Sequence, residues 1–595
     1  MSVLLYKGAK YRTLAGKKIF RNGKWIELPA SAKMYLDGQW YPLGRTVPGS
    51  SIPDIPDMPE VPEITHINGE EPSGKKWYIS PAGAGAQDGS SWSNAAPVSD
   101  IHIIMLQAVS GDSVYLMEGS YTTNRVISVP EGVNFYGGFS AENPQWSTRN
   151  GFDTPTVFTG TADFIFVAPA TRETPFTLDG VSLSVYQGVA SYGTDMDHPN
   201  QVTIRNARLY QVAECRCMAF SHIIVDRGDY VCGETAEFCN CSNVSQILRI
   251  GTLSDCYCAK LSCLASVLQR CILVDCSTNS RTSKTYSDSF FYKGSGDIAP
   301  KTENCLFCDM KLAPSFSTGG TLLDSVVYNC TVIASTTRKT FIPSSERSYF
   351  VECLITGEYL TSNTYEISLL GSSQKDTLVN CVCEYKYFSF IRNSTGASTA
   401  NCTKMYNCSV SGNNAYIMTA NPVSNCLFVN CEAQQSYLVA NRVNSSYNKG
   451  YIYDCTFVNC KANAAVAISN GVGNSLSFNN ATNSGEFTAD AYGGCACSLY
   501  GGGNVITLGY DNTIARFTAT GYFPARGVQD VGKCPNPATD RAGFDAYIAA
   551  FGDWRPLSNS FLVGHGYTIP DITTDLDGVA RPDPPTIGAY EPKPE

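Results

Sequence analysis

The octapeptide SNCLFVNC, residues 424–431, places a polar residue directly before a cysteine that opens a short apolar run. Variants of this phrase recur along the chain, and their leading cysteines lie 18 to 29 residues apart: Cys305, Cys330, Cys353, Cys381, Cys408, Cys426 and Cys455. One short strand phrase per period of this size is typical of stacked coils, not of a globular sheet. The variable intervals favour a parallel β-helix, because its turns absorb insertions while the stacked strands keep register.

Cysteine is small and apolar enough to form an inward-facing column, with one side chain over the next at the strand spacing of about 4.8 Å. We therefore expect the seven leading cysteines to be core-stacking residues. The polar residues before them are expected at the bends, where stacked amides can hydrogen bond to one another: Asn304, Asn329, Asn380, Asn407 and Asn425.

The remaining cysteine pattern predicts no metal site and no other cofactor. All 25 cysteines lie between Cys215 and Cys534, and close pairs such as Cys215/Cys217 have C-x-C spacing without a nearby histidine. The N-terminal sequence has no apolar signal segment, so we expect synthesis in the cytoplasm with reduced thiols. The net charge of −10 argues against nucleic-acid binding by the main body, and the absence of long apolar runs argues against membrane insertion.

Residues 1–46 contain a 15-residue repeat centred on Gly8, Gly23 and Gly38. Asn22-Gly23 and Asp37-Gly38 favour two-residue hairpin turns, because both central positions need a positive φ. Each copy is therefore predicted to be a small β-hairpin with an aromatic residue on its returning strand: Tyr11, Trp25 and Trp40. Such hairpins bury little alone and need each other, a neighbouring subunit or a docking surface.

Proline returns every third residue at Pro53, Pro56, Pro59 and Pro62, which predicts a polyproline II linker. Three residues per turn give this linker an apolar edge, formed by Ile52, Ile55, Met58 and Val61, and an acidic edge. It is either a stiff spacer or a segment that docks its apolar edge in a groove of a partner or of sister copies.

The predicted organisation has five parts. Within the N-terminal cap, Ser99 and Asp100 precede an amphipathic pattern that predicts a short helix with Ile101, Ile104 and Met105 on its buried face. The parts are basic hairpin repeats at 1–46, a proline-rich linker at 47–75, a β-helix cap with its first coils at 76–160, a β-helix shaft at 161–535, and a closing coil with a C-terminal cap at 536–595.

The two ends of the predicted β-helix resemble a known family. YISPAGAGAQDGSSWSNA at 78–95, VPEGVNFYGGFSAENPQW at 129–146 and DLDGVARPDPPTIGAYE at 575–591 are similar to segments of right-handed parallel β-helix proteins common in gut bacteria and their phages. The resemblance implies an all-β fold, a right-handed parallel β-helix solenoid. It implies little about activity, because such folds include lyases, hydrolases, adhesins and phage spikes.

The basic hairpins and the linker resemble the virion-attachment parts of phage tail or capsid fibres. This resemblance implies a virion structural protein, a tail spike, tail fibre or capsid fibre, made in the host cytoplasm and carried on the virion surface. Its virion anchor would include Tyr11, Gly23, Trp25, Gly38 and Trp40. The expected partners are other virion proteins at the N-terminus, host surface polysaccharide or receptor along the β-helix, and sister copies in a homotrimer.

Two other functions fit the same fold, a capsular-polysaccharide depolymerase and a bacterial surface adhesin. A hydrolase needs two carboxyl groups about 5 to 9.5 Å apart. The candidate catalytic residues are Asp195 and Asp197 beside His198, Asp226 and Asp229, and Glu234 and Glu237. The triplet Gly564-His565-Gly566 matches one polygalacturonase motif, but no Asp-Asp pair precedes it, so the sequence favours a non-catalytic protein over a hydrolase or lyase.

Overall fold

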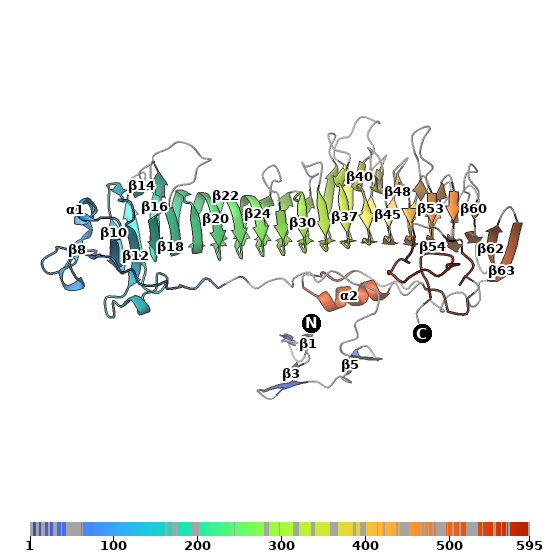
Figure 1. Cartoon of the computed structure of the whole chain (residues 1–595), viewed down its shortest axis with the longest axis horizontal. Helices are drawn as coiled ribbons and strands as arrows, with labels where there is room; N and C mark the ends of the chain where they lie inside the picture. Colours follow the sequence, from blue (N-terminus) through green and yellow to red (C-terminus); the bar gives the residue numbers. More distant parts are fainter. Residues whose placement is uncertain are drawn as a thin grey trace. The chain divides into compact units, whose positions relative to one another are not determined.

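The computed structural model of the chain consists of strands and turns along most of its length (Figure 1). It describes six short strands within residues 4–42 and residues 61, 63–160, 165–168, 176–187, 189–191, 202–242, 244–278, 285–296, 298–312, 320–334, 340–357, 367–384, 388–392, 400–412, 415–419, 423–435, 438–440, 451–458, 460–463, 467–468, 471–473, 475–478, 481–482, 495–496, 498–501, 505–510, 513–518, 534–537, 539–550, 555–560, 562–566, 568 and 572–592. The chain divides into two compact units, one of residues 58–345 with 355–361 and one of the remaining residues.

Three antiparallel hairpins occupy the N-terminal region, as the 15-residue repeat predicted. They are β1 (Leu4–Tyr6) with β2 (Tyr11–Thr13), β3 (Lys18–Arg21) with β4 (Lys24–Glu27), and β5 (Lys33–Leu36) with β6 (Gln39–Pro42). Each returning strand sets its aromatic residue opposite another aromatic, in the pairs Tyr6–Tyr11, Phe20–Trp25 and Tyr35–Trp40. Of the predicted linker edge, Ile52, Ile55 and Met58 lie outside the described residues, and Val61 is exposed.

The 58–345 unit is a coil of parallel strands, and each strand pairs with its counterpart one turn further along the chain. It begins with β7 (Lys76–Ser80), β9 (Ser113–Met117), β12 (Asn134–Phe139) and β15 (Phe176–Asp179), and continues with β18 (Val202–Arg216), β19 (Ala219–Val225), β20 (Gly228–Glu237), β22 (Val244–Ser254) and β24 (Ser262–Gln269). This is the predicted parallel β-helix.

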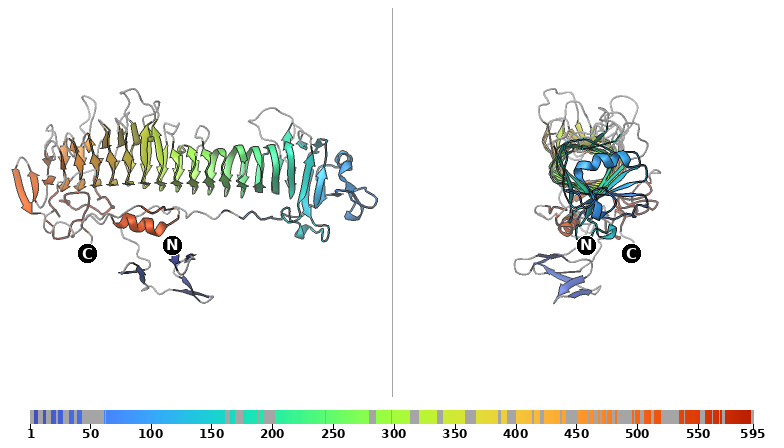
Figure 2. Two further views of the ribbon diagram at one scale, coloured as in Figure 1. Left: turned by 180° about the vertical axis from the view of Figure 1, so that it is seen from behind. Right: turned by 90° about the vertical axis from the view of Figure 1, so that its left-hand side faces the viewer.

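The predicted helix α1 (Ile101–Gln107) lies in front of the coils when this unit is viewed end-on (Figure 2, right). It buries Ile101, Ile104 and Met105, as expected, and leaves Leu106 exposed. The side chain of Asp100 does not cap the helix, because it accepts a hydrogen bond from the Ser99 hydroxyl instead (3.0 Å).

From residue 272 the coils become regular, with three short strands each. Two residues separate the first strand from the second and the second from the third, and the first of these two residues makes a single-residue left-handed turn. In the 58–345 unit the first sheet holds β27 (Thr285–Ser287), β30 (Lys301–Glu303) and β33 (Thr321–Leu323). The second sheet holds β25 (Ile272–Val274), β28 (Phe290–Tyr292), β31 (Leu306–Cys308) and β34 (Val326–Tyr328), and the third holds β26 (Ser277–Thr278), β29 (Ser295–Gly296), β32 (Lys311–Leu312) and β35 (Thr331–Ala334).

The second unit repeats this plan. Its first sheet holds β41 (Ser373–Gln374), β45 (Ala400–Asn401), β49 (Val423–Ser424) and β53 (Tyr451–Tyr453). Its second sheet holds β38 (Tyr349–Val351), β42 (Thr377–Val379), β46 (Lys404–Tyr406), β50 (Leu427–Val429) and β54 (Thr456–Val458), and its third holds β43 (Val382–Cys383), β47 (Ser409–Val410), β51 (Glu432–Ala433) and β55 (Lys461–Ala462). Inward phenylalanines stack between coils, as Phe428 does on Phe457 at 4.8 Å.

The single-residue turns explain why a polar residue precedes each cysteine. Each turn residue has a left-handed backbone, with φ of 52° at Asn304 and 51° at Asn407, a conformation that Asn and Asp tolerate best after glycine. The amides also join successive coils, as expected: Asn407 Nδ2 donates to Asn380 Oδ1 (3.0 Å), and Asn430 Nδ2 donates to Asn407 Oδ1 (2.9 Å).

The seven leading cysteines are all buried and free of disulfides, and within each unit they lie at two different corners of the coil instead of one. Cys305, Cys426 and Cys455 occupy the corner between the first and second sheets, whereas Cys330, Cys353, Cys381 and Cys408 occupy the corner between the second and third. Both corners need a left-handed residue followed by a small buried one, so the same sequence motif, a polar residue followed by cysteine, occurs at both. Their thiols donate to backbone carbonyls, as Cys381 Sγ does to Phe350 O (3.3 Å).

The C-terminal residues do not stack as a last coil. The coils lead instead into an antiparallel meander of β61 (Ser498–Gly501), β62 (Val505–Tyr510) and β63 (Thr513–Thr518). Helix α2 (Arg541–Ala550) and residues 572–592 lie beside much earlier coils of the same unit: Asn380 Nδ2 donates to the Tyr547 hydroxyl (2.6 Å), and Ala589 N donates to Thr456 Oγ1 (3.0 Å). Both faces of strands such as β50 are apolar, and the returning chain keeps the outer face of this sheet buried.

Candidate functional site

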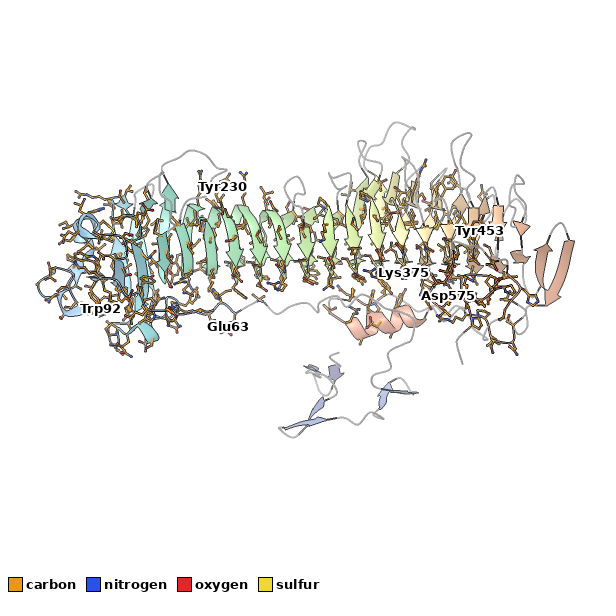
Figure 3. All side chains as sticks on the ribbon, viewed as in Figure 1. Glu63, Trp92, Tyr230, Lys375, Tyr453 and Asp575 are labelled. Atoms are coloured by element: carbon orange, nitrogen blue, oxygen red, sulfur yellow. The ribbon has the colours of Figure 1, made fainter. Side chains whose placement is uncertain are left out.

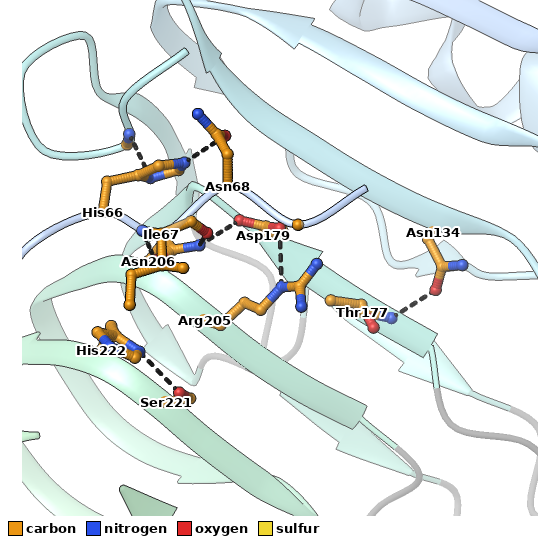
Figure 4. Close-up of polar contacts among 12 residues, drawn as sticks. His66, Ile67, Asn68, Asn134, Thr177, Asp179, Arg205, Asn206, Ser221 and His222 are labelled. Carbon is orange, nitrogen blue, oxygen red and sulfur yellow. Dashed lines mark hydrogen bonds and ion pairs between the residues drawn. The ribbon is translucent and has the colours of Figure 1, made fainter. Parts of the chain in front are cut away.

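A buried carboxylate, Asp179, is the centre of a polar cluster at the start of the β-helix (Figure 4). It ends β15, and the parallel register with β18 sets it opposite Arg205. It accepts hydrogen bonds from Arg149 Nη2, Arg205 Nε and Asn206 Nδ2, each at 2.7 Å. The side chains of Asp179 and Arg149 are 0% exposed. Because a buried charge is stable only when it is paired and hydrogen bonded, these partners depend on one another.

The described end of the linker is fastened to this cluster. Ile67 donates its N–H to Asn206 Oδ1 and accepts at its carbonyl from Asn206 Nδ2, both at 2.9 Å (Figure 4). Trp146 Nε1 donates to Gly69 O (2.9 Å), and the Arg149 guanidinium lies 4.2 Å over the Trp146 ring. We name residues 66–69, with the groups that bind them, the strap latch.

His66 completes the strap latch in its neutral form. Gly151 N–H donates to His66 Nδ1 (3.1 Å), so this nitrogen carries no proton, and Nε2 lies 3.0 Å from Asn68 Oδ1. Burial, and secondly the Arg149 guanidinium, hold the pKa of His66 below its ordinary value of 6.5. Gly151 approaches so closely that a Cβ there would lie 2.3 Å from Asn206 O.

A second group of polar side chains lies two and three coils beyond Asp179. Ser221 Oγ lies 2.8 Å from His222 Nδ1, and the His222 ring stacks on the Phe238 ring with 5.0 Å between centroids. The register between β19 and β20 sets Glu237 opposite Ser221. Burial holds the pKa of His222 below its ordinary value, and the Glu237 carboxylate opposes this shift. We name Ser221, His222, Glu237 and Phe238 the Phe238 patch.

The predicted catalytic carboxylates fall in different places. Asp226 follows β19, where it pairs with Arg208 at 3.5 Å, and Asp229 lies at the start of β20. Glu234 and Glu237 lie toward the other end of β20, and both are exposed.

The other sequence candidates add no paired site. Asp195, Asp197 and His198 lie outside the described residues. His565 bonds through Nδ1 to Val563 O (2.9 Å) on an exposed turn. Within the described ranges, no cluster of three or more His, Cys, Asp or Glu side chains could hold a metal ion, and no helix there is long and apolar enough to cross a membrane.

The motif DLDGVARP near the C-terminus forms a clasp on the coils of its own unit (Asp575 is labelled in Figure 3). Arg581 Nη1 pairs with Glu591 Oε1 (2.9 Å) and Asp454 Oδ1 (3.6 Å), while Nη2 donates to Asn425 Oδ1 (2.8 Å). Burial raises the pKa of Asp575, and backbone N–H donors that include Glu591 oppose the shift. The sequence alone marked these residues only as similar to the C-terminal ending of a family. Neither the strap latch nor the C-terminal clasp was predicted as a site.

Comparison with known proteins identifies no family for this chain. No family model matches the sequence, and no curated protein matches it. Similar solved structures include pectate lyase Pel9A (11% identity, 88% of this chain and 97% of that chain, TM-score 0.15) and Bacteriophage CBA120 tailspike protein 3 (10%, 74% and 69%, 0.21). The catalytic domain of a GH87 α-1,3-glucanase is also similar (11%, 67% and 66%, 0.20). The strand pairing makes this chain a parallel β-helix.

Proposed function

We propose that the protein is a virion structural protein of a phage, a tail spike, tail fibre or capsid fibre that presents its β-helix to host surface glycans or a receptor. The observation that supports this proposal best is the strap latch. A pull on the N-terminal hairpins reaches the coils through Ile67, Asn206 and the buried Asp179–Arg149 pair. A fibre that tethers a particle to a cell needs such a joint between its anchor and its binding surface.

The anchor in this proposal is the set of three basic hairpins. Each sets two aromatic residues opposite each other, yet an isolated two-stranded hairpin is only marginally stable in water. Binding to other virion proteins would bury these aromatics, with Tyr11, Trp25 and Trp40 on the returning strands. Gly23 and Gly38, which complete the proposed anchor, lie outside the described residues. Three copies would pack the apolar linker edge of Ile52, Ile55, Met58 and Val61 together, which gives a homotrimer on the virion surface, assembled from chains made in the host cytoplasm.

Particle incorporation tests the anchor. Phage carrying Trp25→Ala and Trp40→Ala together should assemble particles that lack this protein, because the aromatic contacts of two hairpins are removed. The matched control is Tyr230→Ala, which removes an exposed aromatic from the β-helix and should leave incorporation unchanged. Normal incorporation of the double variant would reject the anchor assignment.

A capsular-polysaccharide depolymerase is the second candidate, because Glu234 and Glu237 are exposed carboxylates three residues apart in β20. Incubation with host capsule separates the two functions. A depolymerase releases new reducing ends or unsaturated uronates, and their release should be lost in Glu237→Gln, whereas a binding fibre releases neither.

A further inference from the structure

Phe238 is out of place in the ladder of left-handed turns. Along the first unit this position holds Asn206, His222, Phe238, Asp255 and Arg270, with φ between 51° and 56°. Asn and Asp tolerate this backbone, whereas for a bulky aromatic residue it is a strained conformation. Burial does not account for the phenylalanine, because 37% of it is exposed. Such strain at a surface position is a reason to look for a binding role.

The surroundings of Phe238 are suited to a sugar. The Phe238 ring stacks on the ring of His222, which lies one coil earlier, and the Ser221 hydroxyl lies beside His222. In the first sheet the parallel register sets Ser221, Glu237 and Ser254 side by side on three successive coils. Glu237 and Thr235 are exposed. An aromatic ring beside hydroxyls and a carboxylate combines an apolar face for sugar C–H groups with acceptors for sugar hydroxyls.

The charges around the ring favour a neutral sugar over an acidic one. The Glu237 carboxylate is exposed and would repel a uronate or sialate carboxylate. Asp255, in the next turn, is held by Arg270, with Arg270 Nε donating to Asp255 Oδ1 at 2.7 Å, so this arginine is not available to attract an acidic sugar.

We propose that the Phe238 patch is a binding subsite for a neutral hexose unit of a polysaccharide. The ring of Phe238 carries the sugar face, the Glu237 carboxylate accepts hydrogen bonds from sugar hydroxyls, and Ser221 and Ser254 add hydroxyl partners. This subsite deepens the proposed glycan-facing function and rests on it.

Affinity electrophoresis of the full chain tests the subsite, with dextran, galactomannan and host capsule as neutral or native probes and polygalacturonate as the acidic probe. The wild type should be retarded by at least one of the first three and not by polygalacturonate. Phe238→Asn fits the left-handed turn better than phenylalanine, so it should keep or raise the melting temperature while weakening binding at least tenfold. Phe238→Trp should restore binding, and Tyr230→Ala, an equally exposed aromatic of β20 outside the patch, should not change it.

The outcomes separate this inference from the proposed function. If the wild type and Phe238→Asn bind the same polysaccharide equally, the subsite is wrong and the glycan-facing function stands. Preferential retardation by polygalacturonate would overturn the choice of a neutral sugar. If the wild type binds no probe, the subsite and the glycan-facing function fail together, and the particle assay still decides the anchor.

Discussion

Replacing Asp179 by alanine tests the strap latch most directly. The carboxylate accepts from three side chains, of which Arg149 is fully buried. Removing one partner of a buried ion pair typically destabilises by about 3–5 kcal/mol, because the other charge is left uncompensated. Asn206 also loses the acceptor that holds its amide toward Ile67, so the linker should detach along with the first coils.

Stacked coils interact mainly with their neighbours, so a global melting temperature averages over many local events. Hydrogen exchange of the Ile67 amide and of β18 is therefore the appropriate assay. A local loss of about 3–5 kcal/mol corresponds to exchange faster by roughly two to four orders of magnitude at these amides, with later coils unchanged. Arg205→Met is the comparison variant, because Arg205 is 36% exposed and Asp179 still keeps Arg149 and Asn206 as partners, so the loss of protection should be smaller than in Asp179→Ala. If Asp179→Ala leaves Ile67 as protected as in the wild type, the latch does not depend on this carboxylate.

Three further predictions concern acid, thiols and the C-terminal clasp. Folding lowers the pKa of His66, so the stability that neutral His66 gives to the folded state is complete above pH 6.5 and is lost as the pH falls through the folded pKa. Protease cleavage near the linker should therefore increase in acid, and His66→Gln should remove this pH dependence. Burial raises the pKa of Cys305 and Cys330 to about 12, so among the cysteines whose burial is described a thiol reagent at pH 8 should label half-buried Cys232 first and the buried cysteines only after unfolding; rapid labelling of many thiols would contradict the packing. Arg581→Ala removes the guanidinium that pairs with the buried carboxylates of Asp454 and Glu591. It should weaken the clasp by about 3 kcal/mol and release residues 572–592 to proteolysis, whereas an uncleaved variant would show that Arg581 does not hold the clasp.

The fold could be predicted because each coil repeats the same conformational requirement on two adjacent residues. A left-handed turn followed by a small buried residue favours Asn-Cys, and this pair is visible in the sequence wherever it occurs. The sequence did not show that the cysteines lie at two different corners, because both corners need a left-handed residue followed by a small buried one. The available clue was the five-residue spacing of Cys426/Cys431 and Cys455/Cys460, which spans one strand of the second sheet.

The C-terminal arrangement and the strap latch depend on contacts between distant residues. Asn206 is 139 residues from Ile67, and no local pattern connects them. The apolar run LFV at 427–429 did contain a signal, because a strand apolar on both faces must be covered on both. Such a run indicates that something covers the outer face, but not that residues 572–592 do so.

Incubation of the protein with purified host capsule, with binding and cleavage products followed in the same sample, distinguishes a binding fibre from a depolymerase. A binding fibre should show saturable binding that Phe238→Asn weakens, with no new reducing ends and no unsaturated uronates. Turnover of the capsule would contradict the assignment as a binding fibre, and the absence of any binding would contradict the glycan-facing role of the β-helix.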